Sequence, residues 1–364
     1  MKNSTQLACL FGLLALASCS STASTTRTFE VQNRFTVDVP EGTKTTRAWF
    51  ALPDDGEGLQ EIQGLKISAK NSKGAEVPTR QVRDANNNRF LYLELAGGGE
   101  SLEVNTTFEV KRQEATHSVD PKGTRALTAA ESAEMAAYLG QSQQVVITPE
   151  IRAGAAEVVG DETNPMVQAR KLYDWTLGHM QYWVKFPDVM KSSGVGSSTY
   201  AFEKCTGNCT DFHSLYTAAA RSVGLPTRMV YGSFFKLPLD GQAKDQSYHC
   251  WIEFWVPNLG WTPLDVAVAD LYIDDFAVTE ANSDKVALTL ADGYAGPDAA
   301  RVDYYFGNLD ARRVTWNRGR DLLIQPEPKA GAINALPKAH VEFDGASASE
   351  KKGWTRELTF KEIQ

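Results

Sequence analysis

The residue with the clearest chemical potential is Cys209, which lies in the run GNCTDFH at 207–213. Apolar residues at helical spacing follow it, and Gly224 and Pro226 end the pattern, so we predict a helix that begins near Cys209. Asn208 suits the N-cap, which puts Cys209 in the first turn. There the unpaired N–H groups and the helix dipole favour thiolate over thiol. A single cysteine can equally be a small, inert core residue, so the interpretation needs partners.

The partners lie forty residues later. The run YHCWIEFWV at 248–256 is typical of a β-strand, because aromatic and β-branched residues dominate it. Its alternation puts five apolar residues on one face and His249 on the other. A turn at 257–260 and a second strand-like run at 261–268 predict a hairpin that brings Asp265 beside His249. In acyl transfer a thiolate attacks the carbonyl, an imidazole carries the proton and a carboxylate orients the ring.

Three blocks of sequence together resemble the core of the transglutaminase-like superfamily, relatives of the papain-type cysteine peptidases. The blocks are 207–213, the run RSVGLPTR at 221–228 with Gly232, and YHCWIE at 248–253 with Gly260, Trp261 and Asp265. The resemblance implies that Cys209 is the nucleophile, His249 the general base and acid, and Asp265 the orienting carboxylate. One departure is Cys250, where the family more often has alanine after the histidine.

The same geometry predicts where an oxyanion would be stabilised. The backbone N–H of Cys209 has no partner at the helix start and can face the developing charge. A second donor has to come from a side chain, and Tyr182 and Trp251 are the candidates. Both residues are aromatic and can equally be packing groups beside a cleft.

Metal binding is the competing interpretation of these residues. Cys205, Cys209 and His213 are four apart and would share one face of a continuous helix, with His249 and Cys250 to complete a zinc site. The Gly-Asn pair before Cys209 argues for a break that takes Cys205 off that face. No calcium-binding loop is present in the sequence either. We therefore expect no metal and no cofactor.

The N-terminus predicts export and anchoring. Residues 1–18 resemble a lipoprotein signal peptide, with an apolar stretch too short to span a bilayer and the ending LASC. Cleavage there would leave a lipidated Cys19; an ordinary signal peptide with an incidental cysteine is the alternative. We expect a lipid-anchored cell-envelope protein, facing the periplasm from the outer membrane in a Gram-negative host, because Ser20 follows the cysteine. Whether Cys205 and Cys250 form a disulfide stays open.

The length, composition and charge of the chain limit the possible partners and the fold. The chain has 364 residues, 42% of them hydrophobic, and a net charge of −8, so nucleic acid is not an expected partner. We predict an α+β protein in which helices pack on an antiparallel sheet after an N-terminal β-sandwich. The expected divisions are a signal peptide at 1–18, a tether at 19–28, a sandwich at 29–115, a transglutaminase-like catalytic domain at 116–320 and a C-terminal extension of strands at 321–364.

The expected reaction is acyl transfer from a protein or peptide amide through a thioester on Cys209. Hydrolysis is the first choice, because an acyl-enzyme in water hydrolyses unless the site excludes solvent and binds an amine. True transamidation, which cross-links proteins, is one alternative. The other is a non-catalytic binding or scaffold protein that keeps the fold without turnover.

Overall fold

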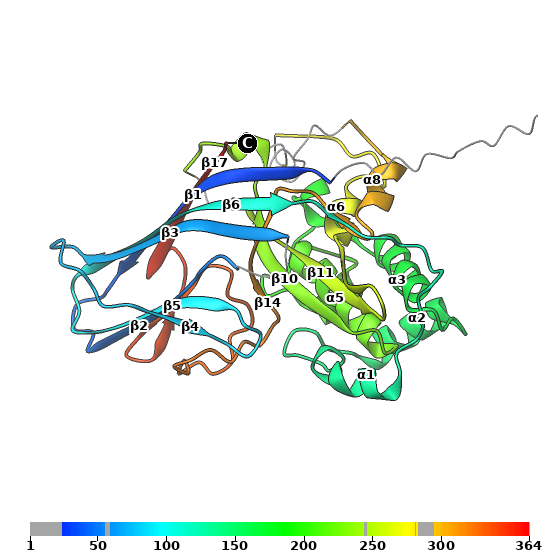
Figure 1. The fold of residues 1–364 in the computed structure, drawn as a ribbon, viewed down its shortest axis with the longest axis horizontal. Helices are drawn as coiled ribbons and strands as arrows, with labels where there is room; N and C mark the ends of the chain where they lie inside the picture. Colours follow the sequence, from blue (N-terminus) through cyan, green and yellow to red (C-terminus); the bar gives the residue numbers. More distant parts are fainter. Residues whose placement is uncertain (1–23, 55–58, 244–245, 281, 283–294, 364) are drawn as a thin grey trace, which may run out of the picture.

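The protein is a mixed α+β molecule with a β-sandwich at one side and a helix-covered sheet at the other (Figure 1). A computed structural model describes residues 24–54, 59–243, 246–280, 282 and 295–363. The predicted signal peptide and Cys19 lie outside the described residues. The α+β class predicted from the sequence is confirmed.

Two antiparallel sheets form the sandwich. One has the order β17-β1-β6-β3 and the other β16-β15-β2-β5-β4. Their bounds are β1 Thr26–Asp38, β2 Thr45–Ala51, β3 Gln60–Asn71, β4 Arg80–Arg83, β5 Arg89–Ala96, β6 Ser101–Gln113, β15 Ala339–Phe343, β16 Ala346–Ala348 and β17 Trp354–Glu362. Alternate residues of β1 and β6 are buried, so each strand gives one face to the core.

The C-terminal strands complete this sandwich rather than forming a separate layer. β17 pairs antiparallel with β1 along nine residues, and β15 pairs with β2. Val341 and Trp354 join Phe35 and Phe50 in the sandwich core. The sandwich therefore combines N-terminal strands with the C-terminal strands β15, β16 and β17, which come from the predicted extension at 321–364. β1 begins at Thr26, so the last three residues of the predicted tether belong to a strand.

The second sheet carries the predicted chemistry, in the order β12-β11-β10-β14. Its strands are β10 Thr227–Phe234, β11 Tyr248–Val256, β12 Gly260–Leu264 and β14 Arg313–Arg318. β11 has the predicted bounds. The predicted second strand of the hairpin, 261–268, is wrong beyond Leu264, because Asp265 caps the short helix α6, Val266–Asp270, with its side chain accepting from Val268 N.

Helices cover one face of this sheet, with α5 at the centre. The helices are α1 Ala129–Glu134, α2 Pro149–Val159, α3 Pro165–His179, α4 Ser198–Lys204, α5 Cys209–Ser222 and α8 Ala299–Tyr304. The short elements are η1 Ala136–Tyr138, η2 Trp183–Lys185, η3 Leu237–Leu239, β7 Ala115–Thr116, β8 Gln181–Tyr182, β9 Thr206–Gly207 and β13 Asn308–Leu309. Residues 209–220 of α5 are all buried, so this helix is packed on every side.

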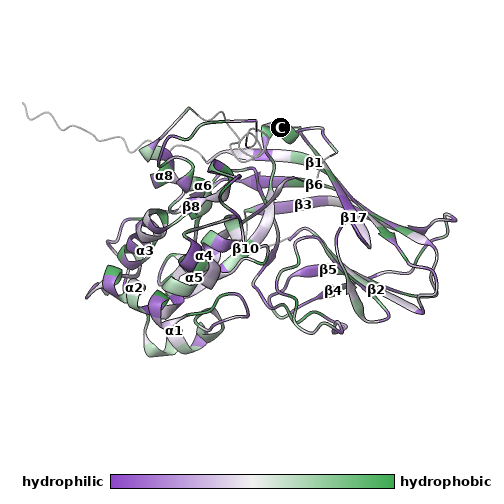
Figure 2. Cartoon of the chain, turned by 180° about the vertical axis from the view of Figure 1, so that it is seen from behind, coloured by the Kyte–Doolittle hydropathy of each residue, from purple (hydrophilic) through white to green (hydrophobic). Residues whose placement is uncertain are grey.

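The sandwich and the helix-covered sheet β12-β11-β10-β14, called the catalytic sheet below for its predicted role, share a hydrophobic contact. Trp316 of β14 and Phe235 after β10 pack with Phe29 and Phe360 of the sandwich. In Figure 2 the outer helices α2 and α3 show hydrophilic and hydrophobic segments side by side, as expected of helices with one solvated face. In the part of the chain that the structure describes, no helix is both long and apolar enough to cross a membrane.

Candidate active site

Cys209 is the first residue of α5, where its backbone N–H has no acceptor within the helix. Asn208 caps the helix: its Oδ1 accepts from the N–H groups of Thr210 (2.9 Å) and Asp211 (3.1 Å). Asp211 closes the capping box by accepting from Asn208 N at 3.0 Å. A Cβ at Gly207 would lie 2.3 Å from that of Asp211, so only glycine fits before the cap. The predicted helix start is confirmed.

Asp211 also holds the segment before α4 in place by hydrogen bonds. Its carboxylate accepts from the backbone N–H of Ser193 at 3.1 Å and of Ser197 at 2.9 Å. One buried acid therefore fixes both the nucleophile's helix and the loop beside it. The sequence analysis did not assign this role, although an acid three residues after an N-cap is a capping signal.

His249 and Asp265 meet as the hairpin prediction requires. The His249 Nε2 atom lies 2.7 Å from Asp265 Oδ2, and both residues are buried. A carboxylate can only accept, so Nε2 carries the proton and Nδ1 is left for Cys209. The β11-β12 ladder ends with Ile252 opposite Leu264, so Asp265 reaches His249 from just past the end of the strand.

The Cys209 thiol and the His249 imidazole lie close enough to shift each other's ionisation. A hydrogen bond from Cys250 and the charge of His249 hold the pKa of the Cys209 thiol well below its usual value, although burial opposes them. Burial works to lower the pKa of His249, but Asp265 and the Cys209 thiolate outweigh it, and the net shift is upward. A thiolate–imidazolium pair is therefore favoured.

Asp265 accepts from more groups than the sequence analysis identified. Arg313 Nη1 lies 2.5 Å from its Oδ2, and His213 Nε2 lies 3.4 Å from its Oδ1. Burial would raise the pKa of Asp265, but the charges of His249 and Arg313 outweigh it and keep the pKa well below the usual range. The carboxylate therefore stays charged. Arg313 comes from β14, distant in sequence, and no local pattern marks it.

Of the two predicted oxyanion donors, the structure brings only Tyr182 to the thiol. Its hydroxyl is close enough to Cys209 to be affected by the thiolate: burial, together with the thiolate charge, raises the pKa of Tyr182 well above its usual value. The hydroxyl therefore keeps its proton. Trp251 lies over Gly232 on the next strand, where a Cβ would come within 2.4 Å of the indole ring. Among the described residues the Trp251 indole forms no hydrogen bond to Cys209.

A second thiol lies beside the first. Cys250 Sγ is 3.5 Å from Thr210 Oγ1 and 3.3 Å from His213 Nδ1. The same Thr210 hydroxyl is 3.9 Å from Cys209 Sγ and 2.9 Å from the Tyr248 hydroxyl. Burial, reinforced by Cys209, raises the pKa of Cys250 well above its usual value, so Cys250 is a proton donor here. His213 is fully buried, so it is not a surface residue of α5.

Lys236 is a buried cation that the sequence analysis missed. It follows β10 and is 5% exposed. Burial and the nearby charge of Arg313 lower its pKa to about 7, although Cys209 and Asp265 favour the charged form. Its Nζ lies 5.6 Å from the ring of Phe234, which itself contacts the His249 ring at 6.0 Å. A lysine after a strand carries no sequence signal of such burial.

Cys205, one of the ligands of the zinc interpretation, lies apart from Cys209 and Cys250. Cys205 ends α4 in the left-handed conformation, and its thiol lies 3.7 Å from His179 Nε2 and 3.7 Å from Phe202 O. The β9 segment separates it from Cys209. Within the described ranges no group of three or more His, Cys, Asp or Glu side chains is arranged to hold a metal ion. Cys205, Cys209 and Cys250 are free thiols.

A cavity of about 420 Å³ lies next to the nucleophile's helix. Asn208, Thr210 and Tyr248 form one wall, and residues 333–339 of the C-terminal part form the other. Cys209 itself is 5% exposed and His249 is 3% exposed. The reacting groups are therefore shielded from bulk water.

Comparison with known proteins agrees with this geometry. Residues 152–266, which include Cys209, His249 and Asp265, match the family model of the transglutaminase-like superfamily. The chain contains a transglutaminase-like domain. This confirms the family resemblance seen in the sequence.

Two relatives match nearly the whole chain. A Haemophilus influenzae protein described as uncharacterized is 24% identical over 366 residues, which cover 92% of this chain and 91% of that protein. A crystal structure from Cytophaga hutchinsonii, described as a "putative cysteine protease", has a TM-score of 0.59 at 14% identity and covers 94% of this chain and 92% of that one. At this identity the structural match shows the fold alone.

Proposed function

We propose that this chain is a cysteine-dependent amide hydrolase that forms a thioester on Cys209. One observation supports this above all. His249 Nε2 lies 2.7 Å from the buried carboxylate of Asp265, and the charge of this histidine helps to hold the pKa of the Cys209 thiol well below its usual value. Nucleophilic catalysis needs a nucleophile, a base beside it and a group that orients the base.

In the proposed reaction the Cys209 thiolate attacks the carbonyl carbon of the amide. The C–N bond then breaks as His249 Nδ1 gives its proton to the leaving amine. Water attacks the resulting thioester, and His249 takes the proton from that water. The acid product leaves, and the Cys209 thiolate is restored. Asp265 keeps the ring in place and stabilises the imidazolium.

The tetrahedral intermediate carries a negative oxygen that needs donors. We assign this role to the backbone N–H of Cys209 and the hydroxyl of Tyr182. Both lie at the thiol, and neither has to move or ionise to donate. Fixed donors in a site shielded from water are worth more than the same groups in solution.

The cavity beside α5 is where we place the substrate. Its walls carry backbone groups and the hydroxyls of Thr210 and Tyr248, but no charged side chain other than Lys338 and Glu350, which pair with each other at 3.0 Å. An uncharged peptide segment suits such walls. Protein and peptide amides are therefore the proposed substrate class.

Trapping and turnover together test the proposal. An electrophilic peptide should add one covalent group at Cys209, located by peptide mapping, and should fail to label Cys209→Ala. A fluorogenic peptide amide library should then yield products whose mass shows water as the acceptor. Selective trapping without any turnover would instead favour the non-catalytic scaffold.

Transamidation is the second candidate, since the reacting groups are only 5% and 3% exposed. A site closed to water gives an amine time to take the acyl group. Incorporation of a labelled primary amine into a glutamine-containing acceptor, in preference to hydrolysis, would decide for this candidate.

We further propose lipid anchoring in the cell envelope through Cys19. The supporting observation is the LASC sequence at 16–19 after a short apolar stretch. Wild-type chain should fractionate with membranes and carry a lipid mass on its N-terminal peptide. Cys19→Ala should stay unmodified; equal fractionation and mass in both forms would contradict the anchor.

A further inference from the structure

A second cavity, of about 490 Å³, lies between the sandwich and the catalytic sheet. Residues of β6, β11, β12 and β14 line it, and Cys209, His249 and Asp265 are not in its wall. It is therefore separate from the candidate active site. Its volume is typical of sites that hold small ligands.

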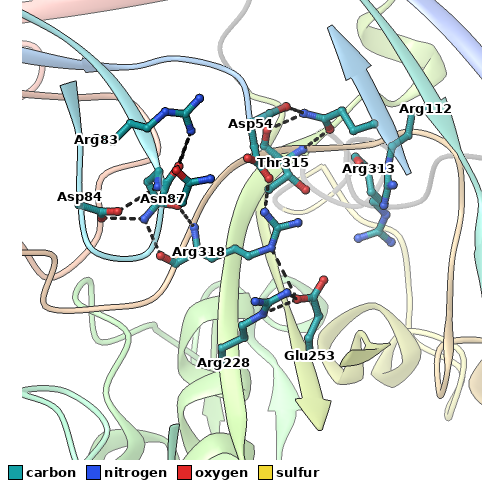
Figure 3. A network of polar contacts seen from close by, with 12 residues as sticks. Asp54, Arg83, Asp84, Asn87, Arg112, Arg228, Glu253, Arg313, Thr315 and Arg318 are labelled. Atoms are coloured by element: carbon teal, nitrogen blue, oxygen red, sulfur yellow. Dashed lines mark hydrogen bonds and ion pairs between the residues drawn. The ribbon is translucent and has the colours of Figure 1, made fainter. Parts of the chain in front are cut away.

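Arg112 is the charged group of this cavity with unused donors. It is 5% exposed, and its Nε donates to Arg313 O at 2.7 Å, which fixes the plane of the guanidinium. Figure 3 places the side chain beside Arg313. Within the described residues, neither terminal nitrogen has a hydrogen-bond or ion-pair partner. Burial lowers the pKa of Arg112 to about 10, so it remains charged at neutral pH.

The acids of the cavity wall are already engaged. Glu253 Oε2 accepts from Arg228 Nε and Nη2, both at 2.6 Å, and lies 3.7 Å from Arg318 Nε. Arg318 also pairs with Asp54, so both acids of this cluster are paired with arginines of the same cluster (Figure 3). These contacts leave the Arg112 charge without a direct counterion.

Glu114 is the other acid in the wall. It accepts from the Tyr304 hydroxyl at 2.6 Å and from Thr25 N at 3.0 Å, so each of its oxygens has a donor. Its charge, with that of Glu253, still disfavours an anion that brings two negative charges. The cavity therefore suits a monoanion better than a phosphate.

Further features of the wall fit an organic ligand. His117 Nδ1 and Trp255 Nε1 belong to wall residues, are buried and have no hydrogen-bond partner among the described residues. The rings of Trp255 and Trp261, 5.5 Å apart, give the cavity an aromatic side. The terminal nitrogens of the Arg112 guanidinium lie in one plane, so their N–H groups match the two oxygens of a carboxylate.

We propose that this cavity binds a monoanionic carboxylate with an aromatic or apolar body, held by the terminal nitrogens of Arg112 and packed against Trp255 and Trp261. Two sources share this chemistry: a small aromatic acid and the C-terminal carboxylate of a peptide. The site would join the sandwich to the catalytic sheet, since Arg112 comes from β6 and the tryptophans come from β11 and β12.

Calorimetric titration of the purified full chain with 3-phenylpropionate tests the proposal. We expect saturable binding in the millimolar range, as suits so small a ligand. The neutral 3-phenylpropanol should bind at least tenfold more weakly, and inorganic phosphate should not compete. Competition by acetyl-Gly-Gly-Phe with a free carboxylate would identify peptide ends as a source, whereas binding of 3-phenylpropionate alone would identify small acids.

Variants distinguish this site from a non-specific one. Arg112→Gln should weaken binding at least tenfold, Arg112→Lys less so, and the exposed sandwich variant Arg80→Gln should bind as wild type does. Trp261→Leu, which leaves the Arg112 contacts intact, should weaken binding several-fold and serves if Arg112→Gln does not fold. The absence of saturable binding to wild type, or equal binding by folded Arg112→Gln or Trp261→Leu, would overturn the proposal.

Discussion

Two buried clusters each include a residue of β11, His249 in one and Glu253 in the other, and they differ in what surrounds their carboxylate. Asp265 is bonded to His249 and Arg313 next to a thiol, whereas Glu253 is bonded to Arg228 and Arg318. Imidazole and thiol exchange protons near neutral pH, but guanidinium does not. The first cluster can therefore do acid–base chemistry, and the second can only hold charges in place.

The two clusters lie about 13 Å apart along the strand, since four residues separate His249 from Glu253. Burial acts to raise the pKa of both carboxylates, and neighbouring cations outweigh it in both. Asp265 and Glu253 are therefore both charged, but they have different roles. A lowered carboxylate pKa alone does not identify a catalytic site; the group that shares the carboxylate does.

The largest expected effect is the loss of the nucleophile. Cys209→Ala should lower peptide amide turnover by about 10⁴-fold or more, because no other described thiol is bonded to His249. The free energy of unfolding should change little by comparison. Steady-state kinetics and urea unfolding measure both quantities. Residual turnover within tenfold of wild type would exclude Cys209 as the nucleophile.

Exchanging the two carboxylates for amides should separate the clusters. Asp265→Asn should lower kcat/KM by about 10²- to 10⁴-fold, because the imidazolium loses its counterion and the ring its orientation. Glu253→Gln should destabilise the fold by about 3 kcal/mol, because it removes the buried negative charge that Arg228 and Arg318 share. In this variant the pH dependence of iodoacetamide alkylation at Cys209 should stay as in wild type. If Glu253→Gln moved that profile as far as Asp265→Asn does, the two clusters would not be distinct.

Lys236 predicts a dependence of stability on pH. Burial lowers its pKa from 10.5 to about 7 in the folded chain. Between these values the unfolded chain holds the extra proton, so this residue makes stability rise with pH from about 7 to 10.5. Below pH 7 its full penalty is present. Lys236→Met should therefore stabilise the fold by a few kcal/mol at pH 6 and progressively less toward pH 10. Urea unfolding at several pH values measures this, and a gain independent of pH would contradict it.

The sequence predicted the parts of the site that local patterns encode. The helix start at Cys209, strand β11 and the meeting of His249 with Asp265 follow from capping residues, alternation and a short turn. Arg313 and Lys236 were missed, because their partners lie far away in sequence. The role of Asp211 was missed although an acid three residues after an N-cap is a capping signal. The strand expected at 261–268 ended early, since Asp265 caps α6 instead of continuing the ladder.

The prediction of the sandwich was limited in the same way, because local patterns do not encode contacts between distant parts of the sequence. Its N-terminal strands were predicted from short alternating runs. That β17 pairs with β1, more than three hundred residues earlier, depends on tertiary pairing that no local pattern specifies. The cavity around Arg112 was missed for a related reason, because its walls come from strands that lie far apart in the sequence.

The smallest expected effect concerns Cys250. Its hydrogen bond is the largest single cause of the lowered pKa of Cys209. Cys250→Ala should therefore move the alkylation midpoint of Cys209 upward while leaving His249 in place. We expect activity to fall by less than tenfold at neutral pH. An unchanged midpoint would show that Cys250 does not lower the pKa of the Cys209 thiol.

The most direct test of the central claim is the pH dependence of iodoacetamide alkylation at Cys209, followed by peptide mapping in wild type and His249→Ala. The account predicts fast labelling that persists to pH 6 or below in wild type. In His249→Ala the labelling should shift toward the ordinary thiol range near pH 8.5. Wild-type labelling that rises only near pH 8.5, unchanged by the loss of His249, would contradict the thiolate–imidazolium pair.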